Sequence, residues 1–411
     1  MYFVYNIVLT FLIFISPFIF LLRILNKKED PKRFLEKFCI YTNKKKSSKI
    51  IWVHAASIGE LLSVVPLIKK LEKVDNVKKI LLTTSTVSSA KVFKKIKLKK
   101  TFHKFYPLDT NHITKKFISC WKPQLAIFVD SEIWPNMLKN LKKNKIPTIL
   151  INARITNKSF KRWKIFETFA NEVFSKITIA LPSNLETQKY LKILGVEKIK
   201  FIGNLKFYGD KKVKNKNNIK NKFKNLKLWC AASTHEGEEK LIYELHKNIK
   251  KYQKKLVTIL IPRHVNRIDE IISDLKMNNL NFVKHSSNQK IKKNTDIYLV
   301  DTYGETSKFY DLTNITFLGG SIIKHGGQNP LEPAREGNYI LSGPNIDNFK
   351  EVYAYLKQIK VSTISSDPLK LEKLIRSKIS QKISNQLQKK IINIGDNILI
   401  NNLKEITGFI K

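Results

Sequence analysis

The chain has 411 residues and a formal net charge of +43 at pH 7, from 76 Lys and Arg against 33 Asp and Glu. This length is sufficient for two domains of ordinary size and an appendage. Its three cysteines, Cys39, Cys120 and Cys230, lie far apart without CxxC or Cys/His spacing. That pattern argues against a zinc site or a disulfide framework, is typical of a reducing compartment, and predicts buried thiols. The charge favours anionic partners, although abundant Lys, Asn and Ile also indicate compositional drift.

The N-terminal segment Tyr2–Leu22 contains no charged residue and has about the length that a membrane-spanning helix requires. Basic residues follow at once from Arg23, so the positive-inside rule places the rest of the chain in the cytoplasm. A cleaved signal peptide would carry its charge before the apolar segment, which this one does not. We therefore predict a membrane anchor at residues 1–25. Because Asn6 and Pro17 weaken the span, a helix that enters only one leaflet is the alternative.

Apolar segments alternate with helical patterns after a basic connector at residues 26–48. The strands expected in this first half are Lys49–Ala56, Lys79–Thr84, Leu125–Val129, Thr148–Ile151, Thr178–Leu181 and Lys200–Ile202. Strands that alternate with helices predict a parallel sheet covered on both faces.

A segment at 208–227, poor in apolar residues and rich in Lys and Asn, predicts an interdomain linker. The alternation then resumes, with strands expected at Leu228–Ala232, Leu256–Ile261, Asp296–Val300, Ile315–Leu318 and Tyr339–Ser342. The fold class is therefore α/β, with two doubly wound domains at 26–207 and 228–368 and C-terminal helices at 369–411. In such domains the carboxyl ends of the strands face the cleft in which ligands bind.

Two carboxylates follow strands of the first domain. Glu60 opens a helix, where the dipole favours a negative charge, so it is either a helix-start residue or a general base that faces the cleft. Glu132 precedes Trp134 and Pro135, which would form a rigid wall. The alternative is a helix start with Pro135 in the first turn and Ser131 or Glu132 as its cap.

The segment from Ile315 to Glu336 suggests a nucleotide site in the second domain. Its strand ends in the pair Gly319 and Gly320, and a second pair, Gly326 and Gly327, follows. Glycine lets the backbone approach a ligand closely, and amides at a helix N-terminus attract phosphate. Glu332, just inside that helix, is placed to accept hydrogen bonds from ribose. The alternative is a strand-to-helix turn that only needs glycine.

Other polar residues follow strands or precede the linker. Ser233 and Thr234 offer hydroxyls and amides to a phosphate, although their spacing to Glu236 and Glu238 also fits a capping box. Arg263 suits phosphate or carboxylate, and Lys206 lies just before the linker, but single basic residues are weak signals in so basic a chain. The histidines, among them His264, do not have the spacing of a metal site, and we predict no metal.

Nine short sequence blocks, each of which occurs once, follow one another along the chain up to about residue 355. They are HAASIGE at 54–60, SEIWPN at 131–136, NAR at 152–154, GNLKF at 203–207, AASTHEGEE at 231–239, PRH at 262–264, DTYGE at 301–305, FLGGS…GGQNPLEPA at 317–334 and GP…NF at 343–349. Together these blocks resemble the Kdo transferases (3-deoxy-manno-octulosonic acid transferases), membrane-anchored glycosyltransferases of lipid A assembly. Nine collinear blocks are far more specific than any one of them.

The resemblance implies a GT-B fold of two Rossmann-like domains and an inverting reaction without metal or cofactor. It implies that CMP-Kdo binds the second domain and that the acceptor, the lipid A precursor, binds the first. By the family's pattern Glu60 deprotonates the acceptor hydroxyl, Glu132 supports it, and the hydroxyl attacks the anomeric carbon as CMP departs. The acceptor-binding residues would be Ser57, Trp134 and Arg154; the donor-binding residues would be Lys206, Ser233, Thr234, Arg263, His264, Gly319, Gly320, Gly327, Gln328, Asn329 and Glu332.

The chain departs from the family's pattern after Phe207, where Tyr208 replaces the usual Asp, and after Arg154 and His264. These departures leave the detailed roles of Lys206 and Arg154 open. A GT-B transferase that uses another activated sugar on a different lipid is the alternative.

A membrane-tethered nucleic-acid-binding protein is suggested only by the charge, which is spread along the chain without a recognition motif, so we expect no nucleic acid. A basic cytoplasmic enzyme held at the anionic inner membrane would suit a bisphosphorylated lipid.

Overall fold

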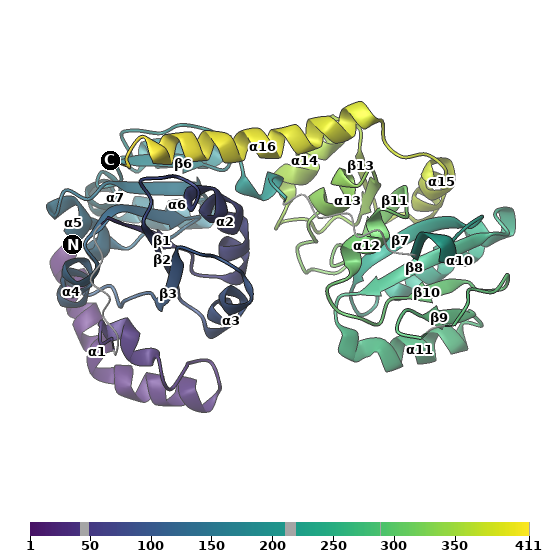
Figure 1. The fold of residues 1–411 in the computed structure, drawn as a ribbon, viewed down its shortest axis with the longest axis horizontal. Helices are drawn as coiled ribbons and strands as arrows, with labels where there is room; N and C mark the ends of the chain where they lie inside the picture. Colours follow the sequence, from purple (N-terminus) through teal and green to yellow (C-terminus); the bar gives the residue numbers. More distant parts are fainter. Residues whose placement is uncertain (42–48, 210–218, 288, 411) are drawn as a thin grey trace. The chain divides into compact units, whose positions relative to one another are not determined.

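The structure is a computed structural model that describes residues 1–41, 49–209, 219–287 and 289–410. The chain divides into two compact units, shown in Figure 1. Unit 1 comprises Met1–Tyr208 and Gly395–Lys411, and unit 2 comprises Gly209–Ile394. Each unit is built on one parallel sheet surrounded by helices, which confirms the predicted α/β class. Of the linker expected at 208–227, residues 210–218 lie outside the described residues.

Unit 1 contains a six-stranded sheet in the order β3-β2-β1-β4-β5-β6, with every neighbouring pair parallel. Its strands are β1 (Ile50–His54), β2 (Lys79–Thr84), β3 (Thr101–Phe105), β4 (Pro123–Val129), β5 (Thr148–Ala153) and β6 (Ile179–Pro182). This is the doubly wound order, in which ligands bind where the chain reverses direction across the sheet. That point lies at the carboxyl ends of β1 and β4.

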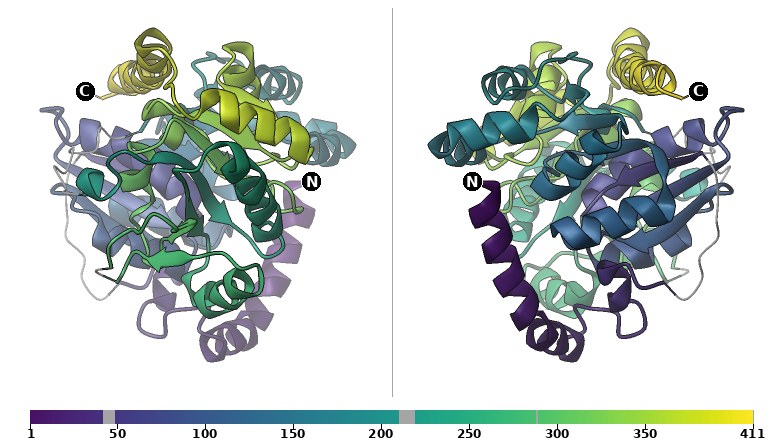
Figure 2. Two further views of the ribbon diagram at one scale, coloured as in Figure 1. Left: turned by 90° about the vertical axis from the view of Figure 1, so that its right-hand side faces the viewer. Right: turned by 90° about the vertical axis from the view of Figure 1, so that its left-hand side faces the viewer.

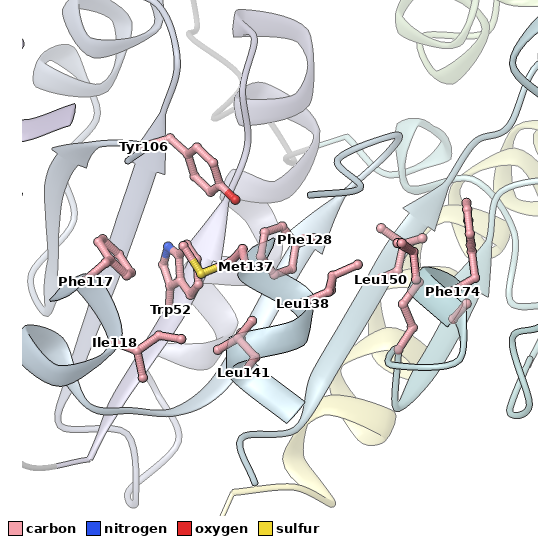
Figure 3. Close-up of a cluster of buried hydrophobic side chains, with 14 of the residues drawn as sticks. Trp52, Tyr106, Phe117, Ile118, Phe128, Met137, Leu138, Leu141, Leu150 and Phe174 are labelled. Atoms are coloured by element: carbon pink, nitrogen blue, oxygen red, sulfur yellow. The ribbon is translucent and has the colours of Figure 1, made fainter. Parts of the chain in front are cut away.

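The helices of unit 1 pack on this sheet through aromatic and branched side chains. They are α1 (Tyr2–Leu25), α2 (Ile58–Leu71), α3 (Val87–Lys95), α4 (Asn111–Trp121), α5 (Pro135–Lys143), α6 (Asn157–Ile165), α7 (Glu167–Phe174) and α8 (Leu185–Ile193), with 3₁₀ turns at Phe34–Phe38 and Leu205–Phe207. In the core drawn in Figure 3, the Trp52 ring lies 4.6 Å from that of Phe117 and 5.1 Å from that of Phe128. The core thus joins the centre of the sheet to α4.

Unit 2 contains a seven-stranded parallel sheet in the order β13-β12-β11-β7-β8-β10-β9. Its strands are β7 (Lys227–Thr234), β8 (Leu256–Pro262), β9 (Phe282–Lys284), β10 (Ile297–Leu299), β11 (Ile315–Leu318), β12 (Tyr339–Ser342) and β13 (Ser362–Ile364). The first strand, β7, lies in the middle, so the chain reverses between β7 and β11. The carboxyl ends of these two strands are therefore the expected ligand position of this unit.

The helices of unit 2 are mostly short. They are α9 (Ile219–Lys222), α10 (Glu239–Tyr252), α11 (Ile268–Met277), α12 (Thr306–Tyr310), α13 (Leu331–Arg335), α14 (Lys350–Gln358) and α15 (Pro368–Lys378), with a 3₁₀ turn at Val265–Arg267. The last helix, α16 (Asn385–Thr407), begins in unit 2 and ends in unit 1. Leu371 and Ile375 of α15 are fully buried in the core of unit 2. A Cβ on Gly395 would lie 2.2 Å from the carbonyl oxygen of Phe207, so α16 contacts unit 1 closely at this glycine.

Several sequence-based expectations need correction. The strand expected at Lys200–Ile202 is wrong, because only Ile199 forms an isolated bridge with Ala180, and the chain then turns at Gly203 with φ of 109°. The strands β3, β9 and β13 were not expected, since edge strands are short or carry polar residues. Cys39 and Cys230 are buried as expected, whereas Cys120 is only half-buried.

The N-terminal helix α1 is long and apolar enough to cross a membrane, by length and composition. It belongs to unit 1, and Figure 2 shows it in purple at the N-terminal end of the chain. Within its most apolar window, 11% of the residues are buried inside the protein. Most of its apolar surface is therefore available to a lipid phase.

Candidate active site

Glu60 lies in the first turn of α2, just beyond the end of β1. Ser57 caps this helix, since its Oγ accepts the N–H of Glu60 at 3.3 Å and donates to Glu60 Oε1 at 2.8 Å. Glu60 Oε2 in turn accepts the N–H of Ala56 at 2.7 Å. This reciprocal bonding resembles a capping box, so the helix-start interpretation of Glu60 is correct. It does not exclude a role as a base, because the carboxylate holds its position at the end of the strand.

The electrostatic environment of Glu60 favours proton uptake. Burial raises the pKa of this carboxyl, the negative charges of Glu132 and Asp130 raise it further, and the hydrogen bonds from Ser57 and Ala56 oppose the shift. A carboxylate with a raised pKa is a better proton acceptor at neutral pH than an ordinary one.

Glu132 has the opposite character. Its Oε2 accepts hydrogen bonds from His54 Nε2 at 3.0 Å and from Trp134 Nε1 at 2.7 Å. Burial alone would raise the pKa of Glu132, but these hydrogen bonds and the charge of His54 outweigh it, so the pKa is lowered. Glu132 therefore stays ionised beside Glu60. Two carboxyls whose surroundings shift their pKa values apart can divide the roles of base and fixed charge.

The predicted cap of α5 is wrong. Pro135 does occupy the first turn, as expected, but Trp134 is the N-cap residue and no side chain bonds to the helix start as a cap. Ser131 Oγ instead donates to the carbonyl oxygen of Arg154 at 2.6 Å. The Ser131 hydroxyl thus joins the segment after β4 to the segment after β5, and the Glu132 carboxylate bonds to His54.

A second polar group in unit 1 includes two residues that sequence reasoning missed. Asp130 and Asn152 have φ of 60° and 50°, and the amide of Asn152 donates to the carboxylate of Asp130. The other end of that amide accepts the N–H of Leu205 at 2.9 Å, which fixes the turn that carries Lys206. Burial raises the pKa of Asp130, while the charges of Lys206 and Arg154 oppose it. The structure therefore groups Lys206 and Arg154 around Asp130, within unit 1.

Glu238 organises the candidate site of unit 2. Its carboxylate is fully buried and accepts four backbone N–H groups: those of His235 at 3.0 Å, Gly320 at 2.7 Å, Ser321 at 2.9 Å and Ile322 at 2.9 Å. Sequence reasoning noticed this glutamate only as a possible capping residue, yet it joins the end of β7 to the turn after β11. The partners of this carboxylate lie up to 84 residues away, so its spacing in the sequence does not reveal them.

These bonds correct the prediction that free amides of the glycine-rich segment hold a phosphate. The N–H of Gly320 donates to Glu238, that of Gly319 donates to Ala232 O at 2.9 Å, and that of Gly327 donates to Gly320 O at 2.7 Å. The helix that follows, α13, has only five residues, and Asn329 Oδ1 accepts its first N–H at 3.1 Å. All of these amides are therefore already bonded within the unit.

The glycines serve close packing instead. A Cβ on Gly319 would lie 2.4 Å from Ser233 O and 2.6 Å from Glu238 Oε2, both too close for any side chain. A Cβ on Gly320 would lie 3.0 Å from the ring of His235 and 3.3 Å from the amide of Gln328. Close packing alone therefore accounts for glycine at both positions.

The remaining predicted donor residues lie around the same strand ends. Ser233 lies one residue before the end of β7 and has φ of 57°. The carbonyl of the buried Thr234, which ends the strand, accepts the N–H of Arg263 at 2.9 Å. The side chains of Arg263, His264 and Glu332 are exposed, and those of Gln328 and Asn329 are half-buried. The structure therefore brings the predicted unit 2 residues to one edge of the sheet, apart from Lys206, which lies in unit 1.

His235 is a further candidate that sequence reasoning missed. Its Nδ1 donates to Ser233 O at 3.0 Å, and its ring lies 4.3 Å from that of His325 and 5.7 Å from that of His264. Burial lowers the pKa of His235, and the positive charge of a protonated His325 lowers it further. Its Nε2 is buried without a hydrogen-bond partner among the described residues. Among all the residues that the structure describes, no group of three or more His, Cys, Asp or Glu residues is placed to hold a metal ion.

Residues 32–208 match the family model described as 3-deoxy-D-manno-octulosonic-acid transferase (kdotransferase). A 3-deoxy-D-manno-octulosonic acid transferase of Rickettsia bellii is 32% identical over 401 residues, which cover 95% of each chain. The enzyme of the same name from Haemophilus influenzae is 29% identical and covers 86% of this chain and 83% of the relative. The chain belongs to the 3-deoxy-D-manno-octulosonic acid transferase family. It is accordingly a glycosyltransferase.

Solved structures agree with this family on the fold. The UDP-GlcNAc 2-epimerase of Neisseria meningitidis superposes with a TM-score of 0.56 at 16% identity and covers 88% of the transferase and 99% of its own chain. MurG of Acinetobacter baumannii superposes with a TM-score of 0.52 at 9% identity, covering 88% and 100%. At such identities the likeness concerns the fold alone, and it confirms the predicted GT-B arrangement of two Rossmann-like sheets.

Proposed function

We propose that this transferase moves Kdo from CMP-Kdo to a hydroxyl of the lipid A precursor (lipid IVA) in lipopolysaccharide biosynthesis. The reaction inverts the anomeric carbon and uses no metal or cofactor. The family supports the transfer of Kdo, and one observation in unit 1 carries the choice of base. Glu60, with its pKa raised, lies in a fixed position beside Glu132, whose pKa is lowered.

In the proposed reaction Glu60 takes the proton of the acceptor hydroxyl. The hydroxyl oxygen forms a bond to the anomeric carbon of Kdo while the bond from that carbon to the phosphate oxygen breaks, and CMP leaves with the electron pair. A single displacement of this kind inverts the configuration. Glu132, held ionised by His54 and Trp134, makes the carboxylate of Glu60 more basic and helps to orient the acceptor. Ser57 fixes the rotamer of the base, and Arg154 lies on the acceptor side.

We assign the donor to the strand ends of unit 2. Negative charge develops on the departing phosphate, so fixed donors of hydrogen bonds there stabilise the transition state. Because the N–H groups of Gly320, Ser321 and Ile322 donate to Glu238, we assign this stabilisation to side chains. The candidates are Arg263, Ser233 and Thr234, and Lys206 stays a predicted donor-binding residue. His235 joins them, since its bare Nε2 becomes a donor once the ring is protonated. Ribose and base recognition falls to the residues His264, Gln328, Asn329 and Glu332.

The helix α1 attaches the enzyme to the inner membrane, with both units on the cytoplasmic side. An acceptor with two phosphates in the inner leaflet suits a chain with a net charge of +43. The anionic lipid surface is thus a third partner of the enzyme, beside its two substrates.

The test is Kdo transfer by the purified enzyme, with CMP-Kdo generated in place and the tetraacylated lipid A precursor as acceptor. Mass spectrometry should show a gain of one or more Kdo units. Glu60→Gln should lower the rate by about 10²- to 10⁴-fold, the usual contribution of a general base. The exposed Glu197, in the same unit, provides the matched control Glu197→Gln, which should retain the wild-type rate.

Two outcomes would contradict the proposal. No gain of mass, with folded protein and an active control enzyme, would refute CMP-Kdo as donor, and competition with UDP-sugars would then identify the alternative. A Glu60→Gln variant that turns over at the wild-type rate would refute Glu60 as the base.

A further inference from the structure

The helix α1 has two faces that both run along its whole length. One face is exposed and apolar: Phe3, Ile7, Phe11, Phe14, Phe18, Leu22 and Leu25 are between 43% and 80% exposed. The other face is buried or half-buried and comprises residues 2, 5, 6, 9, 13, 16 and 20. In both sets nearly all neighbours are three or four residues apart, the spacing of one side of a helix. Unit 1 therefore covers one side of α1 from end to end.

The contacts at both ends belong to unit 1. Tyr2 lies in its core, with the ring 5.1 Å from that of Phe169, and the ring of Phe20 lies 5.4 Å from that of Phe38. Tyr2 and Phe20 are 18 residues apart, which is about 27 Å along a helix and nearly the roughly 30 Å thickness of the hydrocarbon core. A helix that crosses the bilayer would separate these two residues by the membrane. It could not rest on one cytoplasmic unit at both.

Polar contacts near the N-terminal end of α1 also argue against a membrane-spanning helix. Tyr5 Oη donates to Asp109 Oδ2 at 2.9 Å, and Tyr2 Oη donates to Pro135 O at 3.1 Å. Asn136 Nδ2 donates to Asn6 Oδ1 at 2.8 Å. Asp109 is only 4% exposed, so a spanning helix would leave a buried carboxyl without its phenol partner. Losing a partner of a buried polar group is costly.

Asp109 also connects α1 to the candidate acceptor site. Its Oδ2 accepts the N–H of Asn136 at 3.1 Å, and its Oδ1 accepts the N–H of Met137 at 2.8 Å. These are residues of the first turn of α5, directly after Glu132 and Trp134. One buried carboxylate thus receives hydrogen bonds both from α1 and from the segment that carries Glu132.

We propose that α1 is a monotopic anchor. It lies in the plane of the membrane with its exposed face in the cytoplasmic leaflet and both ends on the cytoplasmic side, and Tyr5 and Asp109 hold the acceptor segment of unit 1 at that surface. The partner is a bilayer with anionic head groups. The apolar face is uncharged from Phe3 to Leu22, and the exposed Lys27, Lys28 and Lys32 lie directly beyond the helix. The proposal rests on the membrane attachment stated above.

Topology distinguishes this arrangement from a spanning helix. Full-length protein with a protease-cleavable epitope at the N-terminus, and a second form with the epitope at the C-terminus, are treated with protease in spheroplasts and in inside-out vesicles. A monotopic α1 predicts cleavage of both epitopes in inside-out vesicles and of neither in spheroplasts. Cleavage of the N-terminal epitope in spheroplasts would overturn the proposal. Flotation of the purified protein with vesicles of anionic phospholipid is the second measurement. A dimer that does not float with the vesicles would also overturn the proposal, because a second copy of the chain would then cover the apolar face of α1. These readouts do not depend on Kdo transfer, so they stay interpretable if the proposed reaction fails.

The connection through Asp109 has its own test. Tyr5→Phe removes one hydroxyl and keeps the ring, and Tyr303→Phe, at a residue 80% exposed in unit 2, is the matched control. We expect Tyr5→Phe to raise the KM for the lipid acceptor about three- to tenfold, within the range of one ordinary hydrogen bond, with the KM for CMP-Kdo unchanged. An unchanged acceptor KM, or an equal rise in both KM values, would show that Tyr5 does not position the acceptor segment.

Discussion

Replacing Glu238 with glutamine should loosen the turn after β11 without changing the volume of the side chain. Each carboxylate oxygen accepts two N–H groups: Oε2 those of His235 and Gly320, and Oε1 those of Ser321 and Ile322. In glutamine one of these atoms becomes an NH₂ group, so two N–H groups face a donor and lose their acceptor. A hydrogen bond to a charged group contributes about 1.5–3 kcal/mol, which gives a loss of about 3–6 kcal/mol. That is a large part of the roughly 5–15 kcal/mol by which a domain is stable.

Hydrogen–deuterium exchange of the peptide that contains residues 319–322 measures this loss directly. Since about 1.4 kcal/mol corresponds to a tenfold change in an equilibrium, exchange should become about 10²- to 10⁴-fold faster. Glu236 is exposed two residues away, and Glu236→Gln should change the free energy of unfolding by no more than about 0.5 kcal/mol. If Glu238→Gln is folded by circular dichroism and its loop exchanges no faster than that of Glu236→Gln, the role assigned to the carboxylate is wrong.

Three further predictions concern the base, the buried Asp109 and the core. Ser57→Ala removes a hydroxyl that lowers the pKa of Glu60 and caps α2, so the acid limb of the pH–rate profile should move to higher pH and the free energy of unfolding should fall by about 0.5–2 kcal/mol, whereas Ser57→Thr should restore both. Burial raises the pKa of Asp109 from 3.8 to about 7, so the native state binds a proton that the unfolded chain releases between these values. The stability contributed by this group is therefore present below about pH 4 and lost as the pH rises to 7. Urea titrations at several pH values should show the wild type losing up to about 4 kcal/mol relative to Asp109→Asn over that range, and parallel curves would contradict the assignment. Leu371→Ala should cost about 2–5 kcal/mol in urea unfolding, while the same change at the neighbouring Leu369, 76% exposed, should cost almost nothing.

The central strands of both sheets could be predicted from the sequence, because strands buried on two faces are continuous apolar segments. The expected bounds Lys79–Thr84 and Ile315–Leu318 coincide with β2 and β11. Three edge strands, β3, β9 and β13, could not be predicted in this way. In β3, Thr101–Phe105, four of the five residues are only half-buried, and the pattern TFHKF does not differ from that of a loop.

The site was partly predictable for a similar reason. Residues after strands of a parallel sheet meet at one edge, and this rule located Glu60 and Glu132. The partners that decide their chemistry are remote in the sequence: His54 lies 78 residues from Glu132, and Glu238 lies 82 residues from Gly320. No local pattern expresses such a pairing, so sequence reasoning assigned the amide of Gly320 to phosphate although it donates to Glu238.

That correction changes how the proposed reaction handles charge. A glycine-rich turn with free amides would offer partial positive charges to the CMP phosphate. Here the carboxylate of Glu238 lies at the same strand ends and accepts the N–H groups of residues 320–322. In the proposed reaction we therefore assign the phosphate to cationic side chains instead of these three N–H groups. Arg263 is exposed at the end of β8, and His235 adds a positive charge only if a phosphate raises its lowered pKa enough for the ring to take up a proton. Donor binding would then be coupled to proton uptake by unit 2, while the base in unit 1 must lose its proton before transfer. Protonation of His235 favours low pH, whereas deprotonation of Glu60 favours high pH. We therefore predict that kcat/KM has a bell-shaped dependence on pH, with Glu60 on the acid limb and His235 on the alkaline limb.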